Sequence, residues 1–149
     1  MTGIGFYHLR TMPLERALPS ILERALAQGH RIVVMAGSEE RVKYLDSLLW
    51  TYAEASFLPH GSARDANAAR QPVFLTERDE NPNAASMLVL VDGARSERVG
   101  EFARCCDIFD GGDEAALAAA RRRWSEAKAA GHELTYWEQT ENGWEKRNT

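Results

Sequence analysis

Residues 87–91 read MLVLV, five apolar side chains in an unbroken row. A strand with one face in water alternates apolar and polar residues, whereas a strand buried on both faces is apolar throughout. The stretch therefore predicts a central strand of a sheet that is covered on both sides. Sheets of this kind are typically parallel, and helices form the covering layers.

The segments around this strand alternate between the strand and the helix pattern. Pro13 suits a first helical turn, Gly29 suits the end of that helix, and Ser38 suits an N-cap. Strands are predicted at residues 3–9, 31–36, 56–59, 72–76 and 105–109, and helices at 13–28, 38–52, 96–102 and 113–130. The polar stretch 61–71 is predicted to be a loop. Residues 132–137 and 144–146 are expected to form a C-terminal hairpin, since Asn142-Gly143 favours a tight turn.

The whole chain, residues 1–149, is thus expected to be one α/β domain. Its sheet should be mainly parallel with helices on both faces, a Rossmann-like three-layer arrangement. With 44% hydrophobic and 27% charged residues, the composition is typical of a globular protein. No run of 18 apolar residues and no basic leader followed by an apolar stretch is visible, so a cytoplasmic location is expected. The net charge of −4 argues against an all-over basic surface for nucleic acid.

The motifs that carry nucleotide, metal or thiol chemistry are missing. The segments after the first two strands, HLRTMP (8–13) and GSEERVK (37–43), match no glycine-rich phosphate loop. Gly37-Ser38 could hold one anion and Asp92 could hold magnesium, but a helix cap and a turn are favoured. Cys105 and Cys106 are adjacent, so a bridge between them would be strained, and reduced thiols are predicted. We expect no cofactor, metal site or catalytic residue. A nucleotide-binding enzyme without a standard phosphate loop stays an alternative.

The helix predicted at 113–130 contains the stretch RRRW, residues 121–124. At about 100° per residue, Leu117, Arg121, Trp124 and Lys128 form one stripe beside a smooth stripe of alanines. In one interpretation Trp124 packs into the core and the two cations cover its ring. In another, the ring is a half-exposed apolar floor for a peptide that ends in an apolar side chain and a carboxylate. A direct single-stranded DNA binder that stacks bases there is the third possibility, ranked lower because of the net charge.

A second concentration of large side chains lies in LLWTYAEASFLPH, residues 48–60. Trp50, Tyr52, Phe57 and Pro59 surround the expected connection between a helix and a strand. Aromatic residues at such positions often belong to the core. They are also the residue types that anchor protein–protein interfaces.

Several segments taken in order resemble the chi subunit family of bacterial DNA polymerase III. They are FYHL (6–9), LDSLLWTYAEASFLPH (45–60), QPVFLT (71–76), MLVLVDG (87–93) and CCDIFDGGDEAALAAARRRWSEAKAAGHELTYW (105–137). The patterns LD-x-x-LW, SF-x-PH and R-x-R-W-x-x-x-K-x-x-G in that order are far more specific than any one of them. The resemblance runs along nearly the whole chain.

This resemblance implies an α/β fold and a non-catalytic adaptor of the clamp loader. Such subunits grip the acidic C-terminal tail of single-stranded DNA-binding protein, and the matching positions are Arg121, Trp124 and Lys128. Leu117 and Ser125 stand where lysines are expected, and Arg122 and Arg123 are candidates to compensate for them.

A second interface, on the opposite side, holds the psi subunit or an accessory helicase in this family. The matching positions there are Trp50, Phe57 and Pro59.

Overall fold

The computed structural model describes residues 2–51, 60–62, 68–141 and 143–147. Their strands form one eight-stranded sheet. The strands are β1 (Gly3–Leu9), β2 (Ile32–Met35), β3 (Gly61–Ser62), β4 (Val73–Thr76), β5 (Met87–Leu90), β6 (Arg104–Asp110), β7 (Glu133–Thr140) and β8 (Gly143–Arg147). The helices are α1 (Leu14–Ala27), α2 (Glu39–Thr51) and α3 (Glu114–Ala129), with short 3₁₀ turns η1 (Ala68–Arg70) and η2 (Val99–Glu101).

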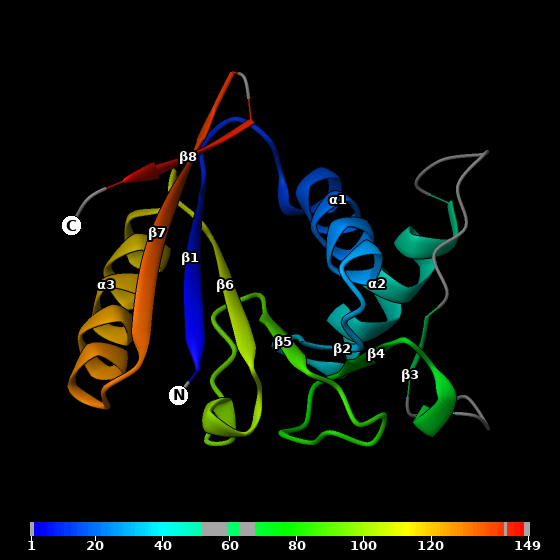
Figure 1. Ribbon diagram of the computed structural model, residues 1–149. Helices are drawn as coiled ribbons and strands as arrows, with labels where there is room; N and C mark the ends of the chain where they lie inside the picture. Colours follow the sequence, from blue (N-terminus) through cyan, green and yellow to red (C-terminus); the bar gives the residue numbers. More distant parts are fainter. Residues whose placement is uncertain (1, 52–59, 63–67, 142, 148–149) are drawn as a thin grey trace.

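The strand order across the sheet is β3-β4-β2-β5-β6-β1-β7-β8. Every neighbouring pair is parallel except β7 and β8, which form the antiparallel hairpin that the sequence predicts. Helices α1 and α2 lie on one side of the sheet and α3 lies on the other (Figure 1). The expected parallel, three-layer α/β architecture is confirmed.

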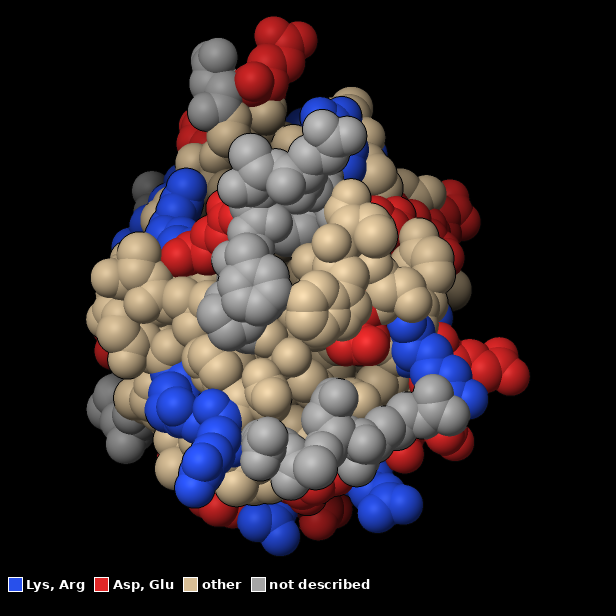
Figure 2. All heavy atoms as spheres, turned by 90° about the vertical axis from the view of Figure 1, so that its right-hand side faces the viewer, with Lys and Arg blue, Asp and Glu red and all other residues tan. Residues whose placement is uncertain are grey.

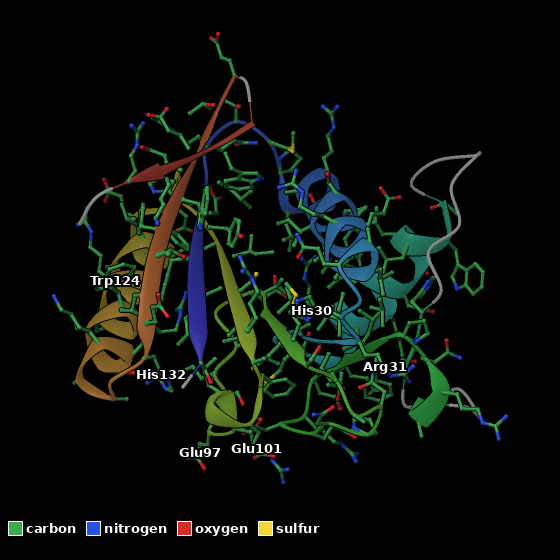
Figure 3. The ribbon with its side chains drawn as sticks, viewed as in Figure 1. His30, Arg31, Glu97, Glu101, Trp124 and His132 are labelled. Carbon is green, nitrogen blue, oxygen red and sulfur yellow. The ribbon has the colours of Figure 1, made fainter. Side chains whose placement is uncertain are left out.

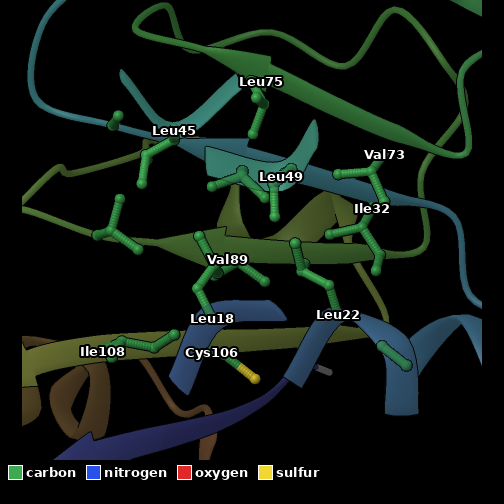
Figure 4. Close-up of a cluster of buried hydrophobic side chains, with 14 of the residues drawn as sticks. Leu18, Leu22, Ile32, Leu45, Leu49, Val73, Leu75, Val89, Cys106 and Ile108 are labelled. Carbon is green, nitrogen blue, oxygen red and sulfur yellow. The ribbon is translucent and has the colours of Figure 1, made fainter. Parts of the chain in front are cut away.

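Strand β5 is buried on both faces, as its sequence predicts. Met87 and Val89 belong to the core cluster under α1 and α2, whereas Leu88 and Leu90 belong to the cluster on the α3 side. Figure 4 shows the first cluster, in which leucines of both helices pack on the strands. The sheet therefore separates two hydrophobic cores, one on each of its faces.

The predicted helix ends are confirmed by local hydrogen bonds and dihedral angles. The Ser38 hydroxyl accepts a hydrogen bond from the backbone N–H of Arg41 at 3.2 Å, which makes Ser38 the cap of α2. Gly29 has a φ of +89°, the left-handed conformation that often follows a helix C-terminus. At α3 the Asp113 carboxylate accepts from the backbone N–H groups of Ala115 and Ala116. Among the described residues no helix has both the length and the apolar character needed to cross a bilayer.

Three predicted elements differ from the structure or cannot be compared with it. The expected loop at 61–71 contains the two-residue strand β3 and the turn η1. The expected helix at 96–102 is only a 3₁₀ turn, since its backbone hydrogen bonds run from the Glu101 N–H to the Arg98 carbonyl and from the Phe102 N–H to the Val99 carbonyl, three residues apart. The predicted strand at 56–59 lies outside the described residues.

The two adjacent cysteines are both unbridged and both buried, on opposite faces of β6. Burial raises the pKa of the Cys106 thiol to about 11. At neutral pH this thiol is therefore protonated and packs as a small apolar side chain.

Candidate functional site

Helix α3 crosses the sheet above β1 and leaves a groove along its side, which we call the α3 groove. The groove has a volume of about 390 Å³. Its walls come from one stripe of α3, from the end of β6 and from the middle of β7: Leu117, Ala120, Arg121, Trp124, Ser125, Phe109 and Tyr136. The space is thus mainly apolar, with one cation in its wall.

The floor of the α3 groove is a cluster of aromatic rings. The Trp124 ring meets Phe6 edge-on with a centroid distance of 5.2 Å, and Tyr136 at 5.9 Å. Phe6 is buried, whereas Trp124 and Tyr136 are half-buried. Figure 3 shows Trp124 on α3, the helix beside β7. One side of the Trp124 ring therefore packs on the core and another lines the groove.

Beside Tyr136, His8 completes the wall of rings. Its Nδ1 lies 2.6 Å from the Tyr136 hydroxyl oxygen, and its ring centroid is 5.3 Å from that of Phe109. Gly111 is required there, since a Cβ atom would lie 1.8 Å from His8 Nε2. Burial lowers the pKa of His8, and the nearby charge of Arg121 acts in the same direction. The positive field of Arg121 thus reaches the groove.

The structure brings together two of the three residues predicted for a peptide tail. Arg121 and Trp124 line the α3 groove, whereas Lys128 lies about one turn further along α3 and does not line it. Arg121 and Lys128 are both exposed. Neither forms an ion pair with a carboxylate in the described part of the chain. Both cations are therefore available to an acidic ligand, and Arg121 is the one placed beside the apolar floor.

Arg123 is not available to compensate for missing lysines, so that expectation is wrong. Its Nε and Nη2 donate to the Asp107 carboxylate at 2.6 and 2.9 Å. The side chains of Arg123 and Asp107 are only 10% and 4% exposed. Burial raises the pKa of Asp107, although the hydrogen bonds from Arg123 oppose that shift. The signal in the sequence was the aspartate inside the apolar strand RCCDIFD, because a buried carboxylate needs a cationic partner. Arg122 is exposed, as predicted.

A second surface lies on α2, on the side of the molecule that Figure 2 presents. Trp50 and Tyr44 are 56% and 47% exposed, an unusual exposure for such large apolar side chains. The Trp50 ring lies 4.7 Å from the imidazole of His60, which in turn contacts Asp46. Uncharged side chains make up much of this face (Figure 2). Phe57 and Pro59 lie outside the described residues.

The two places where a doubly wound sheet usually holds phosphate are filled by the protein's own oxygens. After β1, Gln139 Oε1 accepts hydrogen bonds from the backbone N–H groups of Arg10, Thr11 and Met12, each at 2.9 Å. At the start of α2, the Asp92 carboxylate receives two hydrogen bonds from Arg41, at 3.0 and 3.1 Å. The predicted helix cap at Ser38 and turn at Asp92 are thus confirmed. Asp92 and Gly93 both have positive φ.

The cleft between these two places has a volume of about 740 Å³ at the carboxyl ends of β1, β5 and β6. Its charged lining consists of Arg10, Arg41, Arg123, Glu15, Asp92, Asp110 and Asp113. Carboxylates outnumber cations in that lining, and Arg41 and Arg123 are already paired. Such a cleft repels a polyphosphate, which disfavours the nucleotide-binding alternative.

Comparison with known proteins identifies a family for this chain. Residues 1–135 match the family described as DNA polymerase III chi subunit, HolC. The probable DNA polymerase III subunit chi of Rickettsia prowazekii (strain Madrid E) is 30% identical over 105 residues, which cover 68% of this chain and 64% of that relative's length. Among solved structures, the C-terminal domain of the DEAD-box protein Dbp5 shares 13% identity at a TM-score of 0.32, covering 93% of this chain and 76% of that one. That score is too low to carry an argument. On the family match, the chain belongs to the DNA polymerase III chi subunit family.

Proposed function

We propose that this protein is a non-catalytic adaptor of the DNA polymerase III clamp-loader complex. In this proposal the α3 groove binds the acidic C-terminal tail of single-stranded DNA-binding protein. The face that carries Trp50 contacts a psi-type clamp-loader subunit or an accessory helicase. DNA is then reached through the tail-bearing protein.

The observation that carries the proposal is Arg121 in the wall of an apolar groove whose floor includes Trp124. A tail of this kind ends in an apolar side chain and a free carboxylate. The floor buries the side chain, and the guanidinium binds the carboxylate with two parallel hydrogen bonds. Lys128, further along the same helix, is placed to attract the acidic residues that precede the end of the tail.

An adaptor role is also supported by how the chain uses its polar groups. The side-chain oxygens of Gln139 and Asp92 lie at the two places where such a sheet would otherwise hold phosphate. The carboxylate of Asp107 is bound by Arg123. These groups stabilise the fold. Asp92 and Arg123 border the cleft of about 740 Å³, but both are already held in ion pairs, with Arg41 and Asp107. The accessible cation beside an apolar floor fits recognition of a chain end.

We expect Arg121→Ala to weaken binding of an acidic peptide with an apolar C-terminal residue by at least about 1.5 kcal/mol. That is the scale of a lost hydrogen bond between charged groups. Fluorescence titration of a labelled peptide at low salt measures the loss. Arg122→Ala is the matched control, because Arg122 is an exposed neighbour on α3 that does not line the groove.

A peptide with an amidated C-terminus separates the role of the carboxylate from general charge attraction. Amidation should weaken binding to the native protein, and Arg121→Ala should add little further loss with the amidated peptide. Equal affinities of native protein and Arg121→Ala for the free-acid peptide would refute the assignment of the α3 groove.

Trp50→Ala is expected to weaken binding of the partner subunit by about 2 kcal/mol, the effect of removing an aromatic anchor from an interface centre. The measurement is calorimetry of the chain with a purified psi-type subunit or helicase. Arg121→Ala serves as the control, since it lies on α3 on the other side of the sheet and should leave this affinity unchanged (Figure 1). A Trp50→Ala protein that binds every such partner as tightly as the native chain would contradict the assignment of this face.

A further inference from the structure

A third aromatic cluster lies on the sheet face opposite the α3 groove, where β1, β7 and β8 run together. It consists of Tyr7, Trp137 and Trp144, which we call the aromatic platform. Tyr7 packs on the core cluster under α1, whereas its neighbour Phe6 belongs to the cluster on the α3 side. The three rings line a hollow of about 410 Å³ between the sheet and α1.

The rings of the platform form a floor and a wall. Tyr7 and Trp137 are register partners on β1 and β7, and their ring planes are inclined by only 12° at a centroid distance of 6.2 Å. A Cβ on Gly5 would lie 2.8 Å from Tyr7 Cε1, so the tyrosine ring lies against the backbone of its own strand. Trp144 stands at 85° to Tyr7, with centroids 5.1 Å apart. Two nearly parallel rings are thus bordered by a third.

Trp137 is held in place without being buried. Its Nε1 donates a hydrogen bond to the Thr135 hydroxyl at 3.2 Å. The side chain is half-buried and is not among those that pack against either core cluster. A large ring fixed at the surface is available for stacking.

Cations surround the platform although the chain as a whole carries a net charge of −4. Arg24 of α1 and Arg104 of β6 line the hollow, which has no acidic residue in its described lining. Lys146 of β8 lies directly opposite Trp137 and therefore on the same face. All three side chains are exposed, and none forms an ion pair with a described carboxylate.

We propose that the aromatic platform binds a segment of single-stranded DNA directly. Bases stack on Tyr7 and Trp137 against the wall of Trp144, and the phosphates lie near Arg24, Arg104 and Lys146. Flat aromatic rings on a sheet, flanked by separated cations, are the combination that single strands recognise, because every base has a face that stacks. An acidic peptide would also be attracted to these cations by its charge. It offers no flat group, however, that could stack on a pair of parallel rings.

This site goes beyond the proposed function and does not depend on it. The family match ends at residue 135, whereas Trp137, Trp144 and Lys146 lie beyond that point. The α3 groove is on the opposite face of the sheet. One molecule would therefore bind the tail of single-stranded DNA-binding protein and exposed DNA at separate places.

The test is titration of the full chain, without other proteins, into a fluorescein-labelled oligothymidylate at low salt, followed by anisotropy. We expect saturable binding that weakens steeply as salt is added. Trp137→Ala should weaken it by about 10-fold or more, and Trp137→Phe by less, because stacking on one ring is worth about 1–3 kcal/mol. Circular dichroism spectra and thermal unfolding of the same variants should match those of the native chain, which shows that they are folded.

A pair of arginines on different helices tests the charge contribution. Arg24→Gln should reduce the slope of log affinity against log salt by about 0.7, the loss of one phosphate contact with a single strand. Arg122→Gln, an equal loss of charge on α3, should leave the slope unchanged. This comparison holds even if Trp137→Ala fails to fold.

Three results would overturn the proposal. The first is the absence of saturable oligothymidylate binding by the native chain at low salt. The second is binding that survives Trp137→Phe, Trp137→Ala and Arg24→Gln but is lost in Arg121→Ala, which would place the DNA in the α3 groove. The third is an acidic peptide that binds in a Trp137-dependent manner while the oligonucleotide does not.

Discussion

Asp107→Ala is expected to lower the free energy of unfolding by about 3–5 kcal/mol, the largest effect of any substitution considered for this chain. The loss of stability is large because the substitution removes the ion-pair partner of Arg123. Arg123 is 10% exposed and makes two hydrogen bonds to the Asp107 carboxylate, so the substitution leaves its guanidinium buried without an opposite charge. Urea unfolding followed by circular dichroism measures the loss.

The double variant Asp107→Leu with Arg123→Met separates charge from packing. Replacing a buried ion pair by apolar side chains of similar volume is often neutral or stabilising. We therefore expect the double variant to be within about 1–2 kcal/mol of the native protein. A double variant as unstable as Asp107→Ala would show that the ion pair does not account for the loss.

The second large effect is expected at Gln139, whose side-chain oxygen accepts from three successive backbone N–H groups. Gln139→Ala should cost about 1–3 kcal/mol, the cost of leaving polar groups without their partner, because the three N–H groups are only partly buried beside the cleft and water can reach them. Thermal unfolding and urea unfolding both report this loss. Gln139→Glu is the matched control and should cost far less, since a carboxylate oxygen can accept the same bonds.

The same substitution makes a prediction about anions. Three converging N–H groups form a nest of the kind that binds phosphate or sulfate. In Gln139→Ala, sulfate should restore part of the lost stability, whereas chloride at equal ionic strength should not. Equal responses of the native protein and Gln139→Ala to sulfate would contradict this account of the loop.

The sheet was predictable from the sequence because its strands are short apolar runs separated by helical patterns. The apolar stretch MLVLV predicts a strand that is buried on both faces. A strand of that kind needs a covering layer on each side of the sheet, which predicts the three-layer arrangement. Strand β3 was missed since a Gly-Ser pair carries no apolar signal and forms a strand only by lying beside β4. The pattern at 96–102 predicts a helix, but a pattern over seven residues does not separate an α-helix from the 3₁₀ turn that the structure has there.

The α3 groove was predicted in part, for a geometric reason. The helical period predicts that Arg121, Trp124 and Lys128 share one stripe of α3. It does not predict how far the opposing wall, formed by β6 and β7, extends along that stripe. Tyr136 reaches the groove only because β7 pairs with β1 in the register that sets Phe6 opposite Tyr136. This pairing joins residues far apart in the sequence, so the helical period could not predict it. Lys128 lies beyond the groove, and Arg123 points to a carboxylate on β6 that the period could not reveal.

The position of β1 in the sheet has a consequence for synthesis on the ribosome. Although β1 precedes the other described strands in sequence, its neighbours are β6 and β7, and the Thr2 hydroxyl donates a hydrogen bond to the carbonyl of Phe102, 100 positions away. The apolar strand β1 therefore stays unpaired until most of the described chain, including β6, has left the ribosome. Contacts between such distant segments slow folding and expose nascent chains to aggregation. A chain truncated before β6 would lack both strands that pair with β1, and it should need a chaperone far more than the chain that contains β6 and β7 does.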